Sequence, residues 1–387
     1  MIPCLLNTSL MLATLVAGVS VMYCLLCIWT AASFASHRKG VLDPANDLPP
    51  VSFLKPLKGS DPQMYASLRS HCVQDYPAYE ILFGVTNAED PAIPVVEKLI
   101  AEFPDHAIRL VRCDKKLGVN GKVSSLAQLA AVAGHDFFLV NDSDIRVEPD
   151  YLRTVMTELQ APNTGLVTCL YRGVAADTLA SKLESLSIST DFMPGVLVAR
   201  QIEGGLRFGL GSTLALRKGD LETIGGFEAI ADYLADDYEL GRRIADGKLK
   251  VKLSESVVET YLPAYNIAGF FSHQLRWART IRASRPGGYA GLLFTFTLPW
   301  AVLTLILARG TIWTWGLFAA ALVVRTAMAL VTARLVLRDR RFMRSIWLLP
   351  LRDFLAVFLW LGGLTGRKIV WRGEIFNLKN GKLTRSA

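Results

Sequence analysis

Residues 1–36 contain no Asp, Glu, Lys or Arg, and this uncharged N-terminal stretch restricts the possible folds more than any other feature of the chain. Its apolar core, from Leu10 to Ala35, is long enough to cross a hydrocarbon layer of about 30 Å. A cleaved signal peptide is the alternative, but it would have a basic N-terminal region and a shorter apolar run. The stretch therefore predicts a transmembrane anchor. The basic flank His37-Arg38-Lys39 predicts that the following domain is cytoplasmic.

Three further apolar stretches lie towards the C-terminus. Gly288–Leu307 and Ile312–Leu337 are predicted to cross the membrane. The third, Ile346–Leu364, contains the charged pair Arg352-Asp353, and the tail after it holds six Lys or Arg residues and one Glu. A full third crossing here would place this basic tail outside, against the positive-inside rule. We therefore expect a re-entrant or interfacial segment, with a full crossing as the alternative.

The composition fits a protein that combines a soluble domain with membrane segments. The 387 residues are 51% hydrophobic but also 20% charged, and the mean hydropathy is +0.32. The net charge of +8 lies largely at the ends of apolar segments and in the tail. This distribution indicates membrane topology, and we expect no nucleic-acid partner. The six cysteines are scattered and predict neither a disulfide framework nor a zinc site.

Short apolar runs alternate with helical patterns between about residues 50 and 170. Such alternation predicts an α/β fold with a mostly parallel, Rossmann-like, doubly wound sheet. The expected strands are Val51–Leu54, Ile81–Val85, Ile108–Val111, Phe137–Val140 and Leu166–Cys169. The expected helices cover residues 62–72, 92–103, 123–133 and 149–159.

Asp142 and Asp144 follow directly after the apolar run Phe137–Val140. Ligands of open α/β sheets sit outside the carboxyl ends of the strands, where this pair is predicted to lie. Mg²⁺ and Mn²⁺ prefer oxygen ligands and complete their shells with water and substrate phosphates. The pair therefore predicts a cation that holds a nucleotide diphosphate, although Asp-rich surface turns show the same pattern.

Four other clusters are candidates for chemistry. Lys58 lies in a Pro- and Gly-containing loop after the first expected strand, where it could contact phosphate, or be a surface residue. Asp90 could bind a nucleotide, but it also suits a helix cap before Pro91. The pair Asp236-Asp237 could supply a general base or merely cap a helix. The segment 270–285 has the pattern of an amphipathic helix at a membrane surface, with Arg groups suited to phosphate.

Taken in order, these residues resemble those of family-2-like, inverting membrane glycosyltransferases of the GT-A fold. The likeness is greatest to ceramide glucosyltransferases and to the related bacterial hopanoid-associated glycosyltransferases. It runs from about Val51 to Arg285 and touches the tail at Val370-Trp371-Arg372-Gly373. The motifs that carry it are Lys55-Pro56-Leu57-Lys58-Gly59, Asp90-Pro91-Ala92-Ile93, Gly118-Val119-Asn120-Gly121-Lys122, Asp142-Ser143-Asp144-Ile145-Arg146-Val147, Asp236-Asp237-Tyr238 and Arg276-Trp277.

The resemblance implies a role for each matching residue. Asp237 would be the catalytic base, with Asp236 beside it, and Asp142 and Asp144 would hold Mg²⁺ or Mn²⁺ with the diphosphate. The remaining donor-binding residues would be Pro56, Lys58, Asp90, Lys122, Gly211, Ser212, His273, Arg276 and Trp277. His273 stands where the wider family often has Gln or Arg, so its contribution to diphosphate binding is the least supported by the likeness.

Together with the apolar and charge patterns, the resemblance divides the chain into five expected parts. They are a transmembrane anchor (1–36), a cytosolic GT-A domain (37–265), an amphipathic interfacial helix (266–286), C-terminal membrane segments (287–365) and a basic cytosolic tail (366–387). We expect a multi-pass protein of a bacterial inner membrane whose catalytic domain faces the cytoplasm.

The expected reaction moves a sugar from a UDP-sugar to a hydroxyl of a membrane lipid, with inversion. A hopanoid polyol is the expected acceptor, with N-acetylglucosamine or glucose as the sugar, and ceramide glucosylation is the alternative. A processive polysaccharide synthase is disfavoured because three or four spans leave little room for a channel. A non-catalytic lipid-binding or transport protein is an alternative of another class. The intramembrane residues Arg325 and Arg352-Asp353 would suit a transport pathway.

Overall fold

The computed structural model describes residues 2–38, 48–371 and 374–385. The chain divides into two compact units, which are described separately. The sheet unit comprises residues 38–176, 199–263 and 371–387. The helical unit comprises residues 1–37, 177–198 and 264–370. Residues 177–198 therefore belong with the apolar helices, although they lie inside the stretch that the sequence assigned to the soluble domain.

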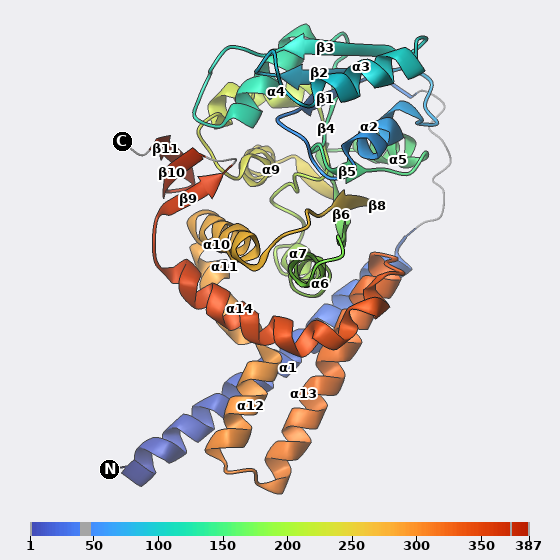
Figure 1. Ribbon diagram of the computed structural model, residues 1–387. Coiled ribbons are helices and arrows are strands. Elements are labelled where there is room, and N and C mark those ends of the chain that lie inside the picture. The colour runs from blue at the N-terminus through green and yellow to red at the C-terminus, as the bar shows by residue number, and fades with distance from the viewer. Residues whose placement is uncertain (1, 39–47, 372–373, 386–387) are drawn as a thin grey trace. The chain divides into compact units, whose positions relative to one another are not determined.

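The sheet unit is built on an eight-stranded sheet with the strand order β3-β2-β1-β4-β7-β6-β8-β5 (Figure 1). Neighbours β3, β2, β1 and β4 pair in parallel, as do β6 and β8, whereas β7 runs antiparallel to both β4 and β6. The predicted mostly parallel α/β fold is confirmed. The strands are β1 (Val51–Pro56), β2 (Tyr79–Val85), β3 (Ala107–Arg112), β4 (Phe137–Val140), β5 (Ile145–Arg146), β6 (Thr164–Val174), β7 (Leu214–Arg217) and β8 (Lys250–Tyr261).

Helices cover both faces of the parallel part of this sheet. Phe53, Ile81 and Phe83 point to one face and pack with apolar residues of α2, α3 and α5 in a single core. Because side chains alternate along a strand, Leu54 and Leu82 point to the other face, where α4 packs on β1 and β2. The helices of the unit are α2 (Met64–Cys72), α3 (Ile93–Glu102), α4 (Gly121–Val132), α5 (Tyr151–Leu159), α8 (Lys218–Thr223), the 3₁₀-helix η2 (Glu228–Ile230) and α9 (Asp236–Asp246).

The C-terminal tail forms three short strands, β9 (Lys368–Trp371), β10 (Glu374–Lys379) and β11 (Lys382–Arg385), although the sequence analysis expected only a basic segment. β10 and β11 pair antiparallel around Asn380 and Gly381, whose φ angles are 52° and 77°. An Asn-Gly pair suits this turn because both residues tolerate positive φ. Leu383 on β11 is 1% exposed, so the hairpin is packed against the sheet unit.

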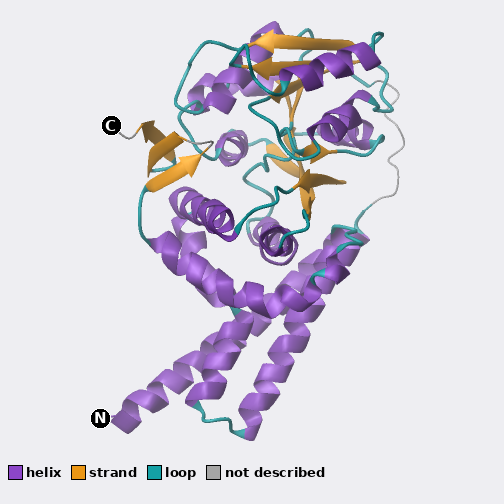
Figure 2. Ribbon diagram, viewed as in Figure 1, coloured by secondary structure: helices purple, strands orange, loops and turns teal. Residues whose placement is uncertain are grey.

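The helical unit consists of helices joined by loops, up to Leu364 (Figure 2). Asn266 caps α10 by accepting a hydrogen bond from the backbone N–H of Gly269 at 2.7 Å. The elements are α1 (Ile2–Ser36), α6 (Leu179–Ser187), the π-helix η1 (Ile188–Phe192), α7 (Met193–Ile202), α10 (Ile267–Ser284), α11 (Pro286–Gly291), η3 (Leu292–Thr295), α12 (Thr297–Leu307), α13 (Ile312–Leu330), η4 (Val331–Val336), η5 (Phe342–Arg344), η6 (Ile346–Leu348) and α14 (Leu349–Leu364).

Three helical segments in the described ranges are long and apolar enough to cross a membrane: Asn7–Ser36, Ile312–Val336 and Ile346–Leu364. A fourth candidate, Pro286–Leu307, is bent by 52°, as in a broken span or a re-entrant loop. The bend lies where Phe296 leaves the helical conformation with ψ at 71°. Thus Ile346–Leu364, which was expected to be re-entrant or interfacial, is long and apolar enough to cross. The bend lies instead in Pro286–Leu307, which overlaps the segment expected to cross. The number of crossings stays a prediction.

Candidate active site

The carboxyl ends of β2, β1 and β4 lie next to one another because these strands are parallel neighbours. The loops that leave this edge carry Lys58 and Asp90 after β1 and β2, and Asp142 after β4. Binding sites of open α/β sheets form at such an edge.

Lys122 connects two of the predicted acidic residues. Its Nζ atom lies 2.8 Å from Asp142 Oδ1 and 3.0 Å from Asp236 Oδ2. Lys122 is in the first turn of α4, which Asn120 caps by accepting a hydrogen bond from the Val123 N–H at 3.3 Å. Burial lowers the pKa of Lys122, but the neighbouring carboxylates outweigh this effect and raise it, so the ammonium stays charged. One cation thus holds Asp142 and Asp236 near each other.

Gly211 brings Asp237 to the same place. The backbone N–H of Gly211 donates to Asp237 Oδ2 at 2.7 Å, and its carbonyl accepts from the Asp142 N–H at 3.3 Å. A Cβ atom on Gly211 would lie 2.8 Å from Asp142 Oδ2 and 3.4 Å from Asp237 Oδ2. The glycine therefore permits an approach that a side chain would obstruct. Burial, followed by the charge of Asp236, raises the pKa of Asp237 to about 6.

Asp144, two residues after Asp142, is held by a residue of β8. Its Oδ2 atom accepts a hydrogen bond of 2.5 Å from the Thr260 hydroxyl on β8. Burial, followed by the charge of Asp142, raises the pKa of Asp144 to about 6. The hydroxyl of Ser143, the residue between Asp142 and Asp144, donates a hydrogen bond to the Asp61 carboxylate. Neither Thr260 nor Asp61 was singled out from the sequence, because their partners are remote along the chain.

The acidic pair fits a hard divalent cation. Within the described ranges, no three His, Cys, Asp or Glu side chains are grouped to hold a metal by themselves. Mg²⁺ sites that use substrate phosphates need only one or two protein carboxylates. The Asp142 side chain is 43% exposed, and its Oδ1 atom contacts the Lys122 ammonium.

Lys55 is a residue of this site whose position the sequence analysis missed. It lies in β1 and is 0% exposed, and its Nζ atom is 3.2 Å from both His71 Nε2 and the Asp142 carbonyl oxygen. Burial lowers the pKa of Lys55 to about 7, against the opposing charges of Asp142 and Asp144. The signal available in the sequence was that this lysine directly follows the apolar residues of an expected strand. Lys55 ties β1 to the loop that carries the acidic pair.

Asp90 has a local structural role. Its carboxylate accepts hydrogen bonds from the backbone N–H of Gly59 at 3.0 and 3.2 Å, and from that of Ala92 at 2.9 Å. It therefore holds the β1 loop and the start of α3 together. The exposed Lys58 ammonium lies 3.5 Å from Glu374 of the tail. None of these contacts connects Asp90 to the group formed by Asp142, Asp236 and Asp237.

The other predicted donor-site residues are distributed over both units. Pro56 ends β1, and the buried Ser212 donates from its hydroxyl to the Cys169 carbonyl at 2.9 Å. His273, Arg276 and Trp277 lie on α10 in the helical unit. The His273 ring is stacked on Tyr265 and tilted against Trp277, with ring centroids 5.4 Å apart in each pair.

The model of glycosyl transferase family 21 matches residues 10–384. This chain belongs to glycosyl transferase family 21, and it is a glycosyltransferase. Ceramide glucosyltransferase 1 of Caenorhabditis elegans is 26% identical over 372 residues, which cover 91% of this chain and 76% of that relative. Ceramide glucosyltransferase 3 of the same organism is 25% identical over 378 residues, covering 94% and 80% of the two chains.

A solved structure supports the fold class of this glycosyltransferase. The mannosyltransferase PcManGT from Pyrobaculum calidifontis, in complex with GDP-Man and Mn²⁺, superposes with a TM-score of 0.52 at 19% sequence identity. The likeness covers 91% of this chain and 99% of that chain. At this identity the comparison concerns the fold alone, and it agrees with the predicted GT-A class.

The hairpin of β10 and β11 packs on the loop that precedes Asp236 and Asp237 at the start of α9. The Leu234 N–H donates to the Gly381 carbonyl at 3.0 Å, and the Leu383 N–H donates to the Asp232 carbonyl at 2.7 Å. The same loop receives the side chain of Asn120, which donates to the Tyr233 carbonyl at 2.7 Å. The C-terminus of this family 21 protein thus supports the segment that precedes Asp236.

Proposed function

We propose that this family 21 glycosyltransferase moves a sugar from a UDP-sugar to a hydroxyl of a ceramide-type membrane lipid. The observation that carries the proposal is the convergence of Asp142, Asp236 and Asp237 around Lys122 and Gly211. The acceptor is proposed from two ceramide glucosyltransferases that match over most of this chain. These relatives favour the ceramide alternative over the hopanoid polyol that the sequence analysis preferred. Glucose is accordingly the proposed sugar.

Asp237 is the proposed general base. A carboxyl with a pKa of about 6 is mostly ionised near pH 7, yet basic enough to take up a proton in the transition state. The acceptor hydroxyl oxygen forms a bond to the anomeric carbon while the bond from that carbon to the UDP oxygen breaks. The hydroxyl proton passes to Asp237, and the electron pair leaves with UDP. A single displacement of this kind inverts the anomeric centre.

One divalent metal ion and two lysine ammonium groups would stabilise the negative charge of the departing diphosphate. Asp142 and Asp144 would hold Mg²⁺ or Mn²⁺, which would supply Lewis-acid stabilisation of the phosphate oxygens. Lys122, which lies beside Asp142, offers a fixed ammonium at the same edge of the sheet. Lys58, on the exposed β1 loop, offers a second.

The remaining predicted residues complete the proposal for donor binding. Asp90 positions the β1 loop that carries Lys58, because it binds the backbone of Gly59. Pro56 and Ser212 would shape the donor pocket. From the resemblance alone, Arg276 and Trp277 would approach the diphosphate, with His273 in a weaker role.

The candidate spans support a membrane location, because three segments of the described chain are long and apolar enough to cross. We propose a bacterial inner membrane with the sheet unit in the cytoplasm, where UDP-sugars are made. The basic flank after α1 supports this orientation.

Replacing Asp237 with Asn tests the proposed function. The purified full-length variant should transfer glucose from UDP-glucose to ceramide about 10²–10⁴-fold more slowly than the wild type. Asp75→Asn is the matched control, because the Asp75 side chain is 72% exposed on the same unit, and it should leave turnover unchanged. Near-normal turnover by Asp237→Asn would exclude the base assignment. Absence of UDP release from the wild type, with Mg²⁺ or Mn²⁺ supplied, would favour the transport alternative.

A further inference from the structure

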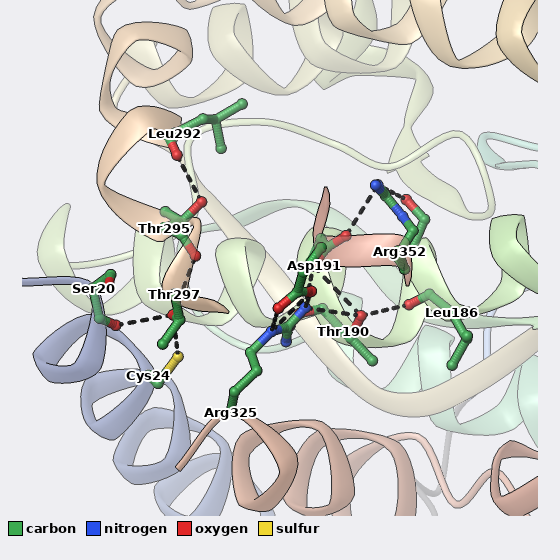
Figure 3. A network of polar contacts seen from close by, with 12 residues as sticks. Ser20, Cys24, Leu186, Thr190, Asp191, Leu292, Thr295, Thr297, Arg325 and Arg352 are labelled. Carbon is green, nitrogen blue, oxygen red and sulfur yellow. Dashed lines mark hydrogen bonds and ion pairs between the residues drawn. The ribbon is translucent and has the colours of Figure 1, made fainter. Parts of the chain in front are cut away.

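The helical unit contains a network of four charged side chains, three of which are buried, whereas the Asp191 side chain is 34% exposed (Figure 3). Arg325 on α13 and Arg352 on α14 are 2% and 5% exposed, and they contact Asp191 on η1 and Asp353 on α14. The network has two positive and two negative charges, so its formal charge is zero. Burial of charges in an apolar unit is costly unless every polar atom has a partner.

Arg325 meets this requirement. Its Nε atom donates to Asp353 at 2.9 and 3.2 Å, and its Nη2 atom donates to Asp353 at 2.6 Å and to Asp191 at 2.7 Å. Its Nη1 atom donates to the Thr190 carbonyl at 2.9 Å. Arg325 therefore fastens η1 to α13 and α14, which is a structural role and not that of an open transport pathway.

Arg352 has donors to spare. Its Nη2 atom donates to the Ser187 hydroxyl at 2.7 Å and lies 3.0 Å from Asp191 Oδ2. Its Nε and Nη1 atoms are buried and have no hydrogen-bond partner. A guanidinium presents five N–H donors in a fixed plane. One edge of this buried group is therefore left to bind an acceptor atom that the chain does not supply.

Spare acceptors lie on the adjoining helix surface. Glu184, Ser187 and Asp191 are spaced three and four residues apart along α6 and η1, so they share one side of this helix. Glu184 Oε1 and Asp191 Oδ2 are buried and accept no hydrogen bond, and Asp191 Oδ2 lies within ion-pair distance of Arg352. Glu184 Oε1 is 3.2 Å from His273 Nδ1, which also has no hydrogen bond. We call Glu184, Ser187, Asp191, His273 and Arg352 the polar seam.

Aromatic rings adjoin the polar seam. Trp277 lies 5.4 Å from His273 and 5.5 Å from Phe192, measured between ring centroids. Phe192 follows Asp191 in η1, so apolar and polar surfaces meet along the same stretch. A ligand bound here would meet both hydrogen-bonding groups and aromatic faces, which suits a molecule with a polar head and an apolar chain.

We propose that the polar seam binds the head of a neutral lipid that carries both hydroxyl and amide groups. Hydroxyl and amide N–H groups would donate to Glu184 and Asp191, and an amide carbonyl would accept from Arg352. The charges explain the preference for a neutral head. Arg352 is balanced by Asp191, and Glu184 adds a negative charge, so no net positive charge is available for a phosphate. This inference rests on the proposed function, which supplies a lipid acceptor, and it specifies that the head of that lipid is recognised.

The test measures lipid binding directly as well as turnover. Full-length protein in phosphatidylcholine nanodiscs is titrated with a photoactivatable ceramide, and crosslinked peptides are identified by mass spectrometry. Arg352→Met should weaken ceramide binding at least tenfold and raise the KM for ceramide. The KM for UDP-glucose and the acceptor-free hydrolysis of UDP-glucose should be unchanged. Arg334→Met is the control, because Arg334 is exposed in the same unit, and its binding should stay within twofold of the wild type.

A second variant guards against misfolding of Arg352→Met. Glu184→Gln keeps the size of the side chain and removes a spare acceptor, and it should weaken ceramide binding at least threefold. Unchanged binding by both variants would overturn the inference. So would absence of ceramide binding to the wild type, or its displacement by equimolar phosphatidic acid. If Arg352→Met abolishes binding while the wild type transfers no sugar to ceramide, the seam stands and the proposed function fails.

Discussion

Gly211→Ala is the sharpest test of the active-site geometry. Gly211 has no side chain, and the methyl group of alanine would meet the carboxylates of Asp142 and Asp237. The φ angle of Gly211 is not among the positive values of this chain, so alanine can adopt its backbone conformation. The added Cβ would lie 2.8 Å from Asp142 Oδ2, whereas ordinary contacts between carbon and oxygen are about 3.3–3.6 Å. Asp142 would therefore have to retreat by roughly 0.5–0.8 Å.

This retreat would act on two contacts of the site. Asp142 would move relative to the Lys122 ammonium, which now lies 2.8 Å away, and Asp237 is within 3.4 Å of the same methyl group. A misplacement of 1 Å can cost a reaction about 10²-fold. We expect kcat/KM to fall about 10-fold to 100-fold, equivalent to about 1.4–2.7 kcal/mol of transition-state stabilisation.

Transfer of radiolabelled glucose from UDP-glucose to ceramide measures this effect in the purified full-length protein. Gly219→Ala on α8 is the control, because no atom lies within 4 Å of its added Cβ, and we expect unaltered turnover. Thermal unfolding of both variants separates a local displacement from loss of the fold. Equal activity of Gly211→Ala and Gly219→Ala would refute the argument that this glycine is needed for the approach of the carboxylates.

Two further predictions concern proton transfer and the tail. Burial and the charge of Asp236 raise the pKa of Asp237 to about 6, so the Asp237 carboxylate becomes protonated as the pH falls below this value. At saturating cation, kcat/KM should therefore drop about tenfold for each pH unit below about 6. A pH–rate profile that stays flat down to pH 5 would contradict this. Truncation after Lys379 removes two backbone hydrogen bonds to the loop before Asp236, each worth about 1 kcal/mol, and should lower both Tm and kcat. The exposed Thr384→Ala variant is its control, and an active truncation with normal Tm would exclude support by the tail.

The strands around the site could be predicted because each is a short apolar run. Phe137–Val140 was predicted with the exact bounds of β4, and the start of β1 at Val51 was also correct. The end of β1 was placed too early because Lys55 is charged, although it lies inside the strand and is fully buried. A single sequence contains no sign that the Asp142 carbonyl and His71 would receive this ammonium.

The tail shows a signal that was present in the sequence but was not used. Asn380-Gly381 lies between two segments in which apolar and polar residues alternate, which is a common hairpin pattern. Its packing on the loop before Asp236 could not be derived, since that contact joins segments about 150 residues apart. The assignment of residues 177–198 to the helical unit had no comparable signal.

The sequence by itself determined the apolar segments, the parallel α/β class and the residue types that could perform sugar transfer, because these depend on local periodicity and composition. Only the tertiary structure decided that Lys122 joins Asp142 to Asp236, that Gly211 permits the approach of Asp237, and that Arg352 retains unused donors. Such contacts depend on distances between remote segments, and those distances follow from the packing of the whole unit.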